Sequence, residues 1–267
     1  MTRRLITFEC EGNELAATLD DASGSTGLVI VSGGNEIRSG AFAGQARLAA
    51  DISAAGFPVF RFDRRGVGDS EGENLGFESS APDIAAAIAA FRSAVPSLKR
   101  IVAYGNCDAA SALMLQSGEG FDGLILSNPW VFDDAVTEQH SPSAVRSRYR
   151  EKLLDPSEIK RLLTGGVSFR KLVRGIAQIA GGQKVESTLF AAMKDGLSGF
   201  DGNVEILVAE RDRTAQAFLD SWDDGDALIQ RCAGASHAYA EPDSFAWLSG
   251  QIREFLANEQ ARQLDMR

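Results

Sequence analysis

Residues 100–110, Arg-Ile-Val-Ala-Tyr-Gly-Asn-Cys-Asp-Ala-Ala, form the stretch from which the rest of the chain can be interpreted. The apolar run that ends at Tyr104 predicts a buried strand, and the small residues that begin at Ala109 predict a helix. Cys107 stands between them at the tip of a tight turn. The residues beside so tight a turn have to be small, and Gly105 and Ala109 meet this condition. The stretch therefore predicts a strand, a sharp turn that presents Cys107, and a helix.

The composition limits the class of protein. The chain has 267 residues, of which 44% are hydrophobic and 24% charged, and this suits one α/β domain with an insertion or two small domains. The net charge of −10 argues against general nucleic-acid binding. The three cysteines are widely spaced and odd in number, which fits a reducing compartment better than a disulfide framework. No secretory signal or membrane-spanning run is apparent in the sequence, so we expect a cytoplasmic protein.

Alternating and fully apolar runs predict eight strands, with helices between the later ones. The predicted strands are Leu5–Cys10, Glu14–Asp20, Gly27–Ser32, Phe57–Phe62, Ile101–Tyr104, Gly123–Ser127, Val204–Ala209 and Ala227–Cys232. The first two read as an antiparallel hairpin, and the remaining strands as parallel. The predicted fold class is α/β, with a mostly parallel eight-stranded sheet covered by helices on both faces. We expect residues 1–132 and 201–267 to form this core, and residues 133–200 to form a helical lid inserted into it.

The carboxyl ends of the predicted strands carry residues suited to nucleophilic catalysis. Ligand sites in such sheets lie beyond these ends, where we expect Cys107, Asp212 and His237 to meet. A Cys107 thiolate would attack an acyl carbon, His237 would exchange the proton, and Asp212 would orient the imidazole. Asp133 is an alternative residue for orienting the histidine. His140, the second of the two histidines, lies in the insertion and reads as solvated.

An oxyanion needs hydrogen-bond donors close to the nucleophile. We expect the backbone N–H groups of Asp108 and of Gly34 or Asn35 to supply them, because both segments follow parallel strands. The sequence predicts no cofactor and no metal site, since it lacks a P-loop, a C-x-x-C pair and an H-E-x-x-H pattern.

Several of these stretches resemble known families. The run Phe62–Gly72 resembles the D-x-R-G-x-G-x-S loop of α/β-hydrolases. The nucleophile elbow of these enzymes normally reads G-x-S-x-G, and Gly105–Ala109 resembles it with cysteine in place of serine. More narrowly, Gly105–Ala110, the loop Gly33–Gly40 and Asp212–Phe218 resemble the exosortase A system-associated hydrolases of type 1. The resemblance implies an α/β-hydrolase fold and a role near bacterial exopolysaccharide production or export. The order nucleophile, acid and base along the chain is also that of the α/β-hydrolases.

The cysteine at the elbow is similar to that of the dienelactone hydrolases, in which a glutamate on the loop after the third strand contacts the resting cysteine. Glu36 lies on the corresponding loop of this chain, and Arg38 follows it. We therefore expect Glu36 and Arg38 to be substrate-binding residues.

The predicted insertion is basic in an otherwise acidic chain. Residues 146–184 contain ten lysines and arginines and three acids, a local charge of +7. A basic lid suits an anionic substrate, such as a phosphate-bearing acyl carrier, a coenzyme A thioester or an acidic sugar chain. Alternatively, Phe169 to Ile179 reads as an amphipathic helix that packs on the core or rests on an anionic membrane.

The sequence thus favours a cytoplasmic hydrolase or acyl transferase with a Cys-His-Asp triad, acting on an ester or thioester. The alternative is a hydrolase-like scaffold with little or no catalytic activity that binds a partner in the polysaccharide machinery. Neither the identity of the acyl group nor the oligomeric state can be predicted from the sequence.

Overall fold

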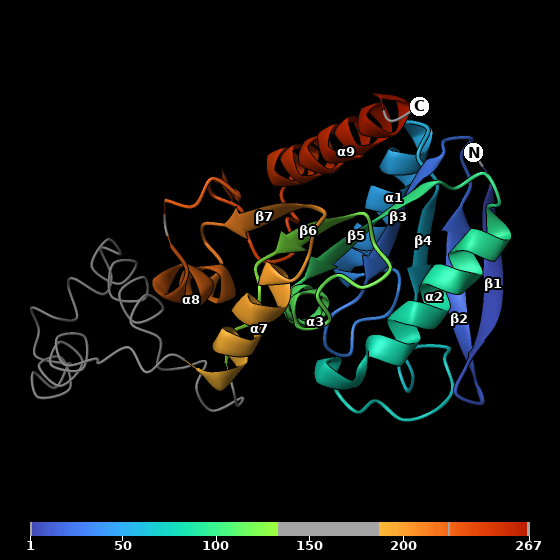
Figure 1. The fold of residues 1–267 in the computed structure, drawn as a ribbon, viewed down its shortest axis with the longest axis horizontal. Helices are drawn as coiled ribbons and strands as arrows, with labels where there is room; N and C mark the ends of the chain where they lie inside the picture. The colour runs from blue at the N-terminus through green and yellow to red at the C-terminus, as the bar shows by residue number, and fades with distance from the viewer. Residues whose placement is uncertain (1, 133–186, 224, 266–267) are drawn as a thin grey trace, which may run out of the picture.

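A computed structural model describes residues 2–132, 187–223 and 225–265 (Figure 1). Its strands form a single eight-stranded sheet with the order β1-β2-β4-β3-β5-β6-β7-β8. Strands β1 and β2 pair antiparallel, β2 pairs antiparallel with β4, and every other pairing is parallel. The predicted mostly parallel sheet of eight strands is therefore confirmed.

The strands lie close to their predicted positions. Their bounds are β1 Arg3–Cys10, β2 Asn13–Asp20, β3 Thr26–Val31, β4 Val59–Phe62, β5 Arg100–Asn106, β6 Gly123–Ser127, β7 Asn203–Ala209 and β8 Ile229–Cys232. The α-helices are α1 Gly44–Ala54, α2 Ala81–Ala94, α3 Asp108–Leu115, α7 Thr188–Ser198, α8 Arg213–Ser221 and α9 Pro242–Asp265, and two short 3₁₀ turns occupy Ala41–Ala43 and Phe77–Ser79.

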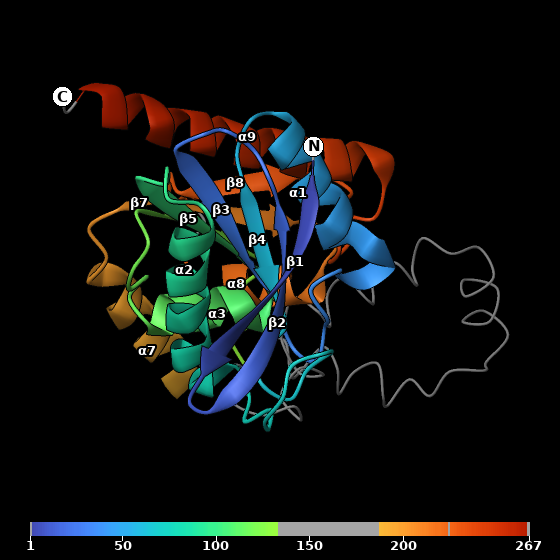
Figure 2. The same ribbon diagram turned by 90° about the vertical axis from the view of Figure 1, so that its right-hand side faces the viewer.

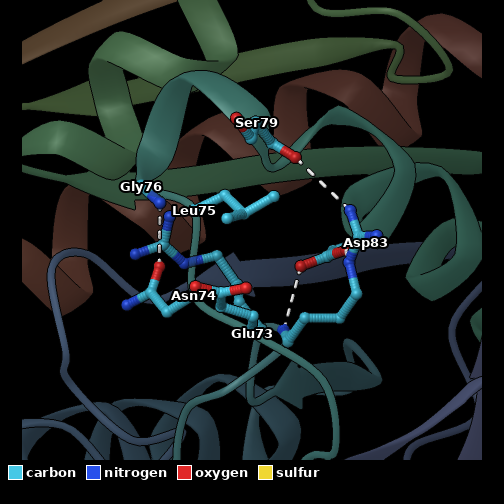
Figure 3. A pocket seen from close by; sticks show the side chains of 8 residues that line it. Glu73, Asn74, Leu75, Gly76, Ser79 and Asp83 are labelled. Carbon is cyan, nitrogen blue, oxygen red and sulfur yellow. Dashed lines mark hydrogen bonds and ion pairs between the residues drawn. The ribbon is translucent and has the colours of Figure 1, made fainter.

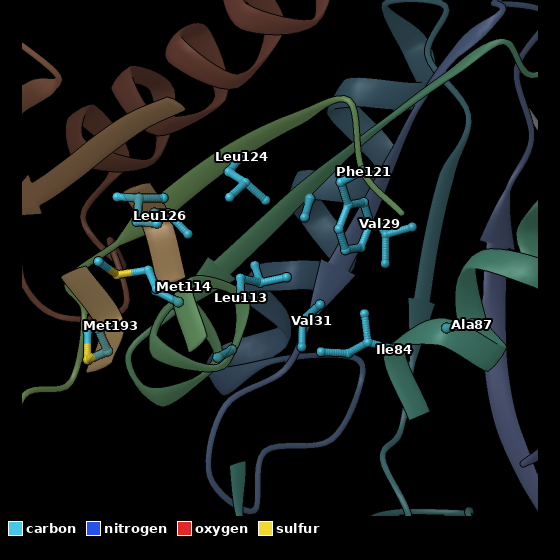
Figure 4. Close-up of a cluster of buried hydrophobic side chains, with 14 of the residues drawn as sticks. Val29, Val31, Ile84, Ala87, Leu113, Met114, Phe121, Leu124, Leu126 and Met193 are labelled. Carbon is cyan, nitrogen blue, oxygen red and sulfur yellow. The ribbon is translucent and has the colours of Figure 1, made fainter. Parts of the chain in front are cut away.

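Helices cover both faces of the sheet, as predicted. Helices α1 and α9 pack on one face, and α2, α3, α7 and α8 pack on the other (Figures 1 and 2). Alternate residues of a strand point to opposite faces, so each central strand contributes to two cores. In β3, Val29 and Val31 lie in the larger core, shown in Figure 4, while Leu28 and Ile30 lie in the smaller one.

Helix α7 belongs to the larger core. Its residues Phe190 and Met193 are buried there, and it approaches α3 so closely that a Cβ on Gly196 would lie 2.3 Å from the carbonyl oxygen of Met114. The other residues of the predicted lid, 133–186, lie outside the described residues. The lid and its boundaries therefore remain a prediction.

The turn between β5 and α3 has the predicted form of an elbow. Cys107 has a φ of 63° and a ψ of −129°, a strained conformation for a residue with a side chain. Such a backbone costs about 1–3 kcal/mol and persists only where the surrounding structure enforces it. Here α3 packs so tightly that a Cβ on Gly105 would lie 2.8 Å from the carbonyl carbon of Ala109.

We expect Gly105→Ala to lower the free energy of unfolding by about 1–3 kcal/mol, because the added methyl group pushes against the backbone of α3. The matched control is Gly250→Ala, whose added Cβ would meet no atom within 4 Å and which lies inside α9. That change should leave stability unchanged or raise it, since alanine is the better helix former. Urea unfolding measures both. Equal stabilities of the two variants would contradict this account of the elbow.

In the part of the chain that the structure describes, no helix is both long and apolar enough to cross a membrane.

Candidate active site

Cys107 is held in place by backbone contacts on both sides of the elbow. Its N–H donates a hydrogen bond of 2.9 Å to the carbonyl oxygen of Ser127, at the end of the neighbouring strand β6. Its own carbonyl oxygen accepts a 3.3 Å bond from the N–H of Trp130. The Cys107 side chain remains partly accessible, whereas Cys10 and Cys232 are buried. The elbow therefore presents one thiol to the site.

Asp212 and His237 meet across two loops at the carboxyl edge of the sheet. The Nδ1 atom of His237 lies 2.8 Å from Oδ2 of Asp212. Asp212 is the N-cap of α8, and the same oxygen accepts a 3.1 Å bond from the N–H of Ala215. Two donors thus orient the Asp212 carboxylate, which is only 8% exposed. This is the contact that the sequence predicts between the acid and the base.

The surroundings of His237 favour its charged form. Burial disfavours the imidazolium, but hydrogen bonds to Asp212 and Cys107, together with the charges of these two groups, raise the pKa of His237 to about 10. Because Nδ1 is engaged by Asp212, the other ring nitrogen is left for Cys107. A charged His237 side chain that Asp212 orients can give its proton to a leaving group.

Two amide side chains position the loop that carries His237. The Nδ2 atoms of Asn106 and Asn128 donate bonds of 3.2 and 3.3 Å to the backbone carbonyl oxygen of His237. Asn128 also donates a 2.9 Å bond to Oδ1 of Asn106 and accepts one of 2.8 Å from the N–H of Ala209. Asn128 is completely buried, so its polar contacts hold the ends of β5 and β7 and the His237 loop together.

A cavity of about 390 Å³ opens beside Cys107 and His237. Its lining comprises Cys107, Asp212 and His237, together with Trp130, Arg211, Arg213, Thr214 and Ser236. The volume is in the range of small-molecule sites. The three predicted catalytic side chains thus line a single cavity.

The loop predicted to supply the second oxyanion donor has a different contact. The N–H of Gly34 lies 2.7 and 2.8 Å from the two oxygens of the Asp108 side chain. The Gly34 N–H is therefore occupied by a carboxylate rather than free for an oxyanion. Gly33 permits this contact, because a Cβ there would lie 2.3 Å from Oδ1 of Asp108. The N–H of Asp108 itself opens helix α3, where such groups have no acceptor within the helix.

The loop that follows β4 fixes the position of Gly34 and Asn35. Buried Arg64 donates a 2.6 Å bond from Nη2 to the carbonyl oxygen of Gly34, and Asn74 donates a 2.8 Å bond to the side chain of Asn35. Beside Asn74 lies a hollow of about 10 Å³, lined also by Glu73 and Asp83 (Figure 3). This is room for about one water molecule, so the hollow is too small to hold a substrate.

Glu36 and Arg38 do not line the cavity. The Glu36 carboxylate accepts bonds of 2.6 Å from the N–H of Ala41 and 2.7 Å from the side chain of Gln45, and burial raises its pKa. Arg38 forms ion pairs with Asp63 and Asp69. These contacts commit both side chains to holding loops, so the structure does not bring Glu36 or Arg38 to the predicted substrate position.

Sequence reasoning missed most of the cavity wall. The missed residues are Trp130, Arg211, Arg213 and Ser236. Their closeness in sequence to the ends of β6, β7 and β8 was the one available signal for them. Nothing local in the sequence marks Asn128 as the partner of Asn106. The alternative acid Asp133, the second histidine His140 and the basic stretch 146–184 lie outside the described residues.

Solved structures from several organisms share this fold. The esterase Pf2001 of Pyrococcus furiosus is 14% identical with a TM-score of 0.64, over 96% of this chain and 92% of that chain. The alpha/beta hydrolase GrgF of Penicillium sp. sh18 is 14% identical with a TM-score of 0.66, over 98% and 100% of the two chains. Est1E of Butyrivibrio proteoclasticus, solved with ferulic acid bound, is 15% identical with a TM-score of 0.59, over 96% and 99%.

These similarities show an α/β-hydrolase fold. No curated protein matches the chain in sequence. Residues 25–175, more than half of the chain, match a family of α/β-hydrolases, and this stretch includes the elbow with Cys107. The chain therefore belongs to the Hydrolase_4 family, described as serine aminopeptidase, S33.

Proposed function

We propose that this protein cleaves or transfers the acyl group of an ester or thioester, with Cys107 as the nucleophile, His237 as the acid and base, and Asp212 as the residue that orients the imidazole. The observation that carries this proposal is the 2.8 Å contact between His237 and Asp212 on the wall of a cavity that Cys107 also lines. The description of the family names serine enzymes, and this chain has a cysteine at the tip of the elbow. A thiol in that position performs the same acyl chemistry.

The reaction proceeds in two halves. The Cys107 sulfur bonds to the acyl carbon, and the carbonyl electrons move to its oxygen. The tetrahedral species then collapses, and the bond to the alkoxide or thiolate leaving group breaks as His237 donates its proton to that group. Water next gives a proton to His237 while its oxygen bonds to the acyl carbon. The carbon–sulfur bond then breaks, which releases the acid and restores the thiolate and imidazolium.

The acyl intermediate is itself a thioester, so an alcohol, amine or thiol acceptor can take the place of water in the second half. Transfer is therefore part of the proposal, alongside hydrolysis. The resemblance of Gly105–Ala110 and Asp212–Phe218 to exosortase-associated hydrolases supports a place for this activity beside exopolysaccharide production.

The oxyanion that forms in each half needs donors, and the N–H groups of Asp108 and Asn35 are the candidates that no carboxylate occupies. The Gly34 N–H joins them once the Asp108 carboxylate gives it up. The carboxylate also places a negative charge close to the developing oxyanion, which opposes its formation.

We therefore expect Asp108→Ala to raise kcat for a neutral chromogenic ester by about tenfold, because it frees one donor and removes one negative charge. Steady-state kinetics on p-nitrophenyl butyrate measure the change. Asp69→Ala is a suitable control, since this mostly exposed aspartate pairs with Arg38 and does not line the cavity. A well-folded Asp108→Ala protein with equal or lower kcat would show that the carboxylate does not compete with the oxyanion.

A rapid-mixing experiment tests the proposed function as a whole. When an excess of p-nitrophenyl butyrate is added, we expect a burst of p-nitrophenol that equals one per protein chain, followed by slower turnover. The burst reports formation of the acyl intermediate. A p-nitrophenol release that equals the buffer rate would contradict the proposal.

A further inference from the structure

Two arginines line the cavity without a close counter-ion. Arg211 follows β7 and Arg213 begins α8, so they flank Asp212, the residue that orients His237. The Arg211 side chain is 65% exposed, and its ion pair, with Glu241, spans 4.0 Å. Arg213 is exposed and forms no ion pair with any residue in the described part of the chain. Both guanidinium groups are therefore available to a molecule in the cavity.

The carboxylates near the two arginines are already engaged. Asp212 accepts hydrogen bonds from His237 and from the N–H of Ala215. Glu241 accepts hydrogen bonds of 3.2 and 2.9 Å from the N–H and the Oγ of Ser236. Glu36 and Asp108 lie on the other side of Cys107 and His237 in contact with the loop that follows β3, and neither lines the cavity beside the arginines. Two guanidinium groups thus remain on the cavity wall without a close ion pair, although the chain as a whole carries −10.

We propose that the cavity selects an ester or thioester whose acyl chain carries an anionic oxygen group, and that Arg211 and Arg213 bind this group while the acyl carbon lies at Cys107. This inference rests on the proposed function and specifies its substrate class. Guanidinium groups suit this role because they form paired hydrogen bonds with carboxylates and phosphates. The Trp130 side chain on the same wall offers an apolar surface to the carbons in between.

Alkylation of Cys107 tests the charge preference without requiring turnover. Iodoacetate and iodoacetamide attach to sulfur in the same way and have nearly the same size, but only iodoacetate is anionic. The measured quantity is the ratio of the two alkylation rates at Cys107, read by peptide mass so that Cys10 and Cys232 are counted separately. We expect Arg211→Gln with Arg213→Gln to lower the iodoacetate-to-iodoacetamide ratio by about tenfold, roughly threefold for each charge.

Three controls make the result specific. The double variant with lysine at both positions should keep most of the wild-type ratio, because it keeps the charge. Arg92→Gln, on an exposed arginine of α2 that does not line the cavity, should leave the ratio unchanged. Added salt should lower the wild-type ratio, because it screens exposed charges. An unchanged ratio in the double glutamine variant would overturn the inference.

A substrate pair separates this inference from the proposed function. The p-nitrophenyl esters of glutaric acid and of hexanoic acid have acyl chains of similar length, and only the first ends in a carboxylate. We expect wild type to prefer the glutarate ester, and the double glutamine variant to lose about tenfold of that preference. Turnover of both esters that depends on Cys107 but shows no such change would refute the anion preference alone. Failure to turn over either ester would refute the proposed function, while the alkylation ratio still reports on the arginines.

Discussion

Replacing Cys107 with alanine lowers kcat/KM for p-nitrophenyl butyrate by at least about 10³-fold, because the variant has no group that can form the acyl intermediate. Any remaining rate then comes from binding and from the oxyanion donors. The substitution removes a partly accessible sulfur and retains the small size that the elbow requires, so we expect the fold to be preserved. Steady-state kinetics measure the loss, and circular dichroism checks the fold.

The matched control for this prediction is Cys232→Ala. Cys232 is 5% exposed at the end of β8 and does not line the cavity. Its replacement also removes one sulfur atom from the chain. We expect kcat/KM within about twofold of wild type, because the residues that line the cavity are unchanged. Turnover that survives in Cys107→Ala, or that is lost equally in both variants, would show that another residue performs the chemistry.

His237→Ala should be nearly as damaging, with a loss of about 10³-fold in kcat/KM. Removing the imidazole leaves the leaving group without an acid and the water without a base. His140→Ala is the matched control, because the chain has two histidines and the sequence predicts a solvated position for His140. A His237→Ala protein that turns over the ester at the wild-type rate would contradict the assigned role.

The raised pKa of His237 adds a pH dependence with a defined direction. The pKa of His237 rises from 6.5 to about 10 in the folded protein, so folding favours the protonated imidazole. Its contribution to stability is complete below about pH 6.5 and is lost as the pH rises through about 10. The difference in urea midpoint between wild type and His237→Ala should therefore shrink across this range. A difference that grows with pH would contradict the predicted ion pair.

The sequence predicted the frame of the site well because the relevant patterns are local. The alternation of strands and helices places the ends of β5, β7 and β8 at one edge, and the small residues Gly105 and Ala109, two positions before and after Cys107, predict the elbow. With two histidines in the chain, the position of His237 just after the last strand was informative.

What the sequence could not predict depends on contacts between distant segments. The Asp108 carboxylate reaches the N–H of Gly34, 74 residues away, and occupies a donor that the loop pattern alone presents as free. Arg38 reads as a cation available to substrate, but Asp63 and Asp69 bind it in the folded chain. Such pairings are set by side-chain packing after the sheet has formed, and no local pattern encodes them.

The central claim is that Cys107 carries the acyl group during the reaction. Its most direct test is mass spectrometry of the protein quenched in acid during turnover of p-nitrophenyl butyrate. We predict one added butyryl group per chain, located by fragmentation on the peptide that contains Cys107 and missing from the Cys107→Ala protein. Release of p-nitrophenol with no butyryl group on Cys107, or with the group on another residue, would contradict the account.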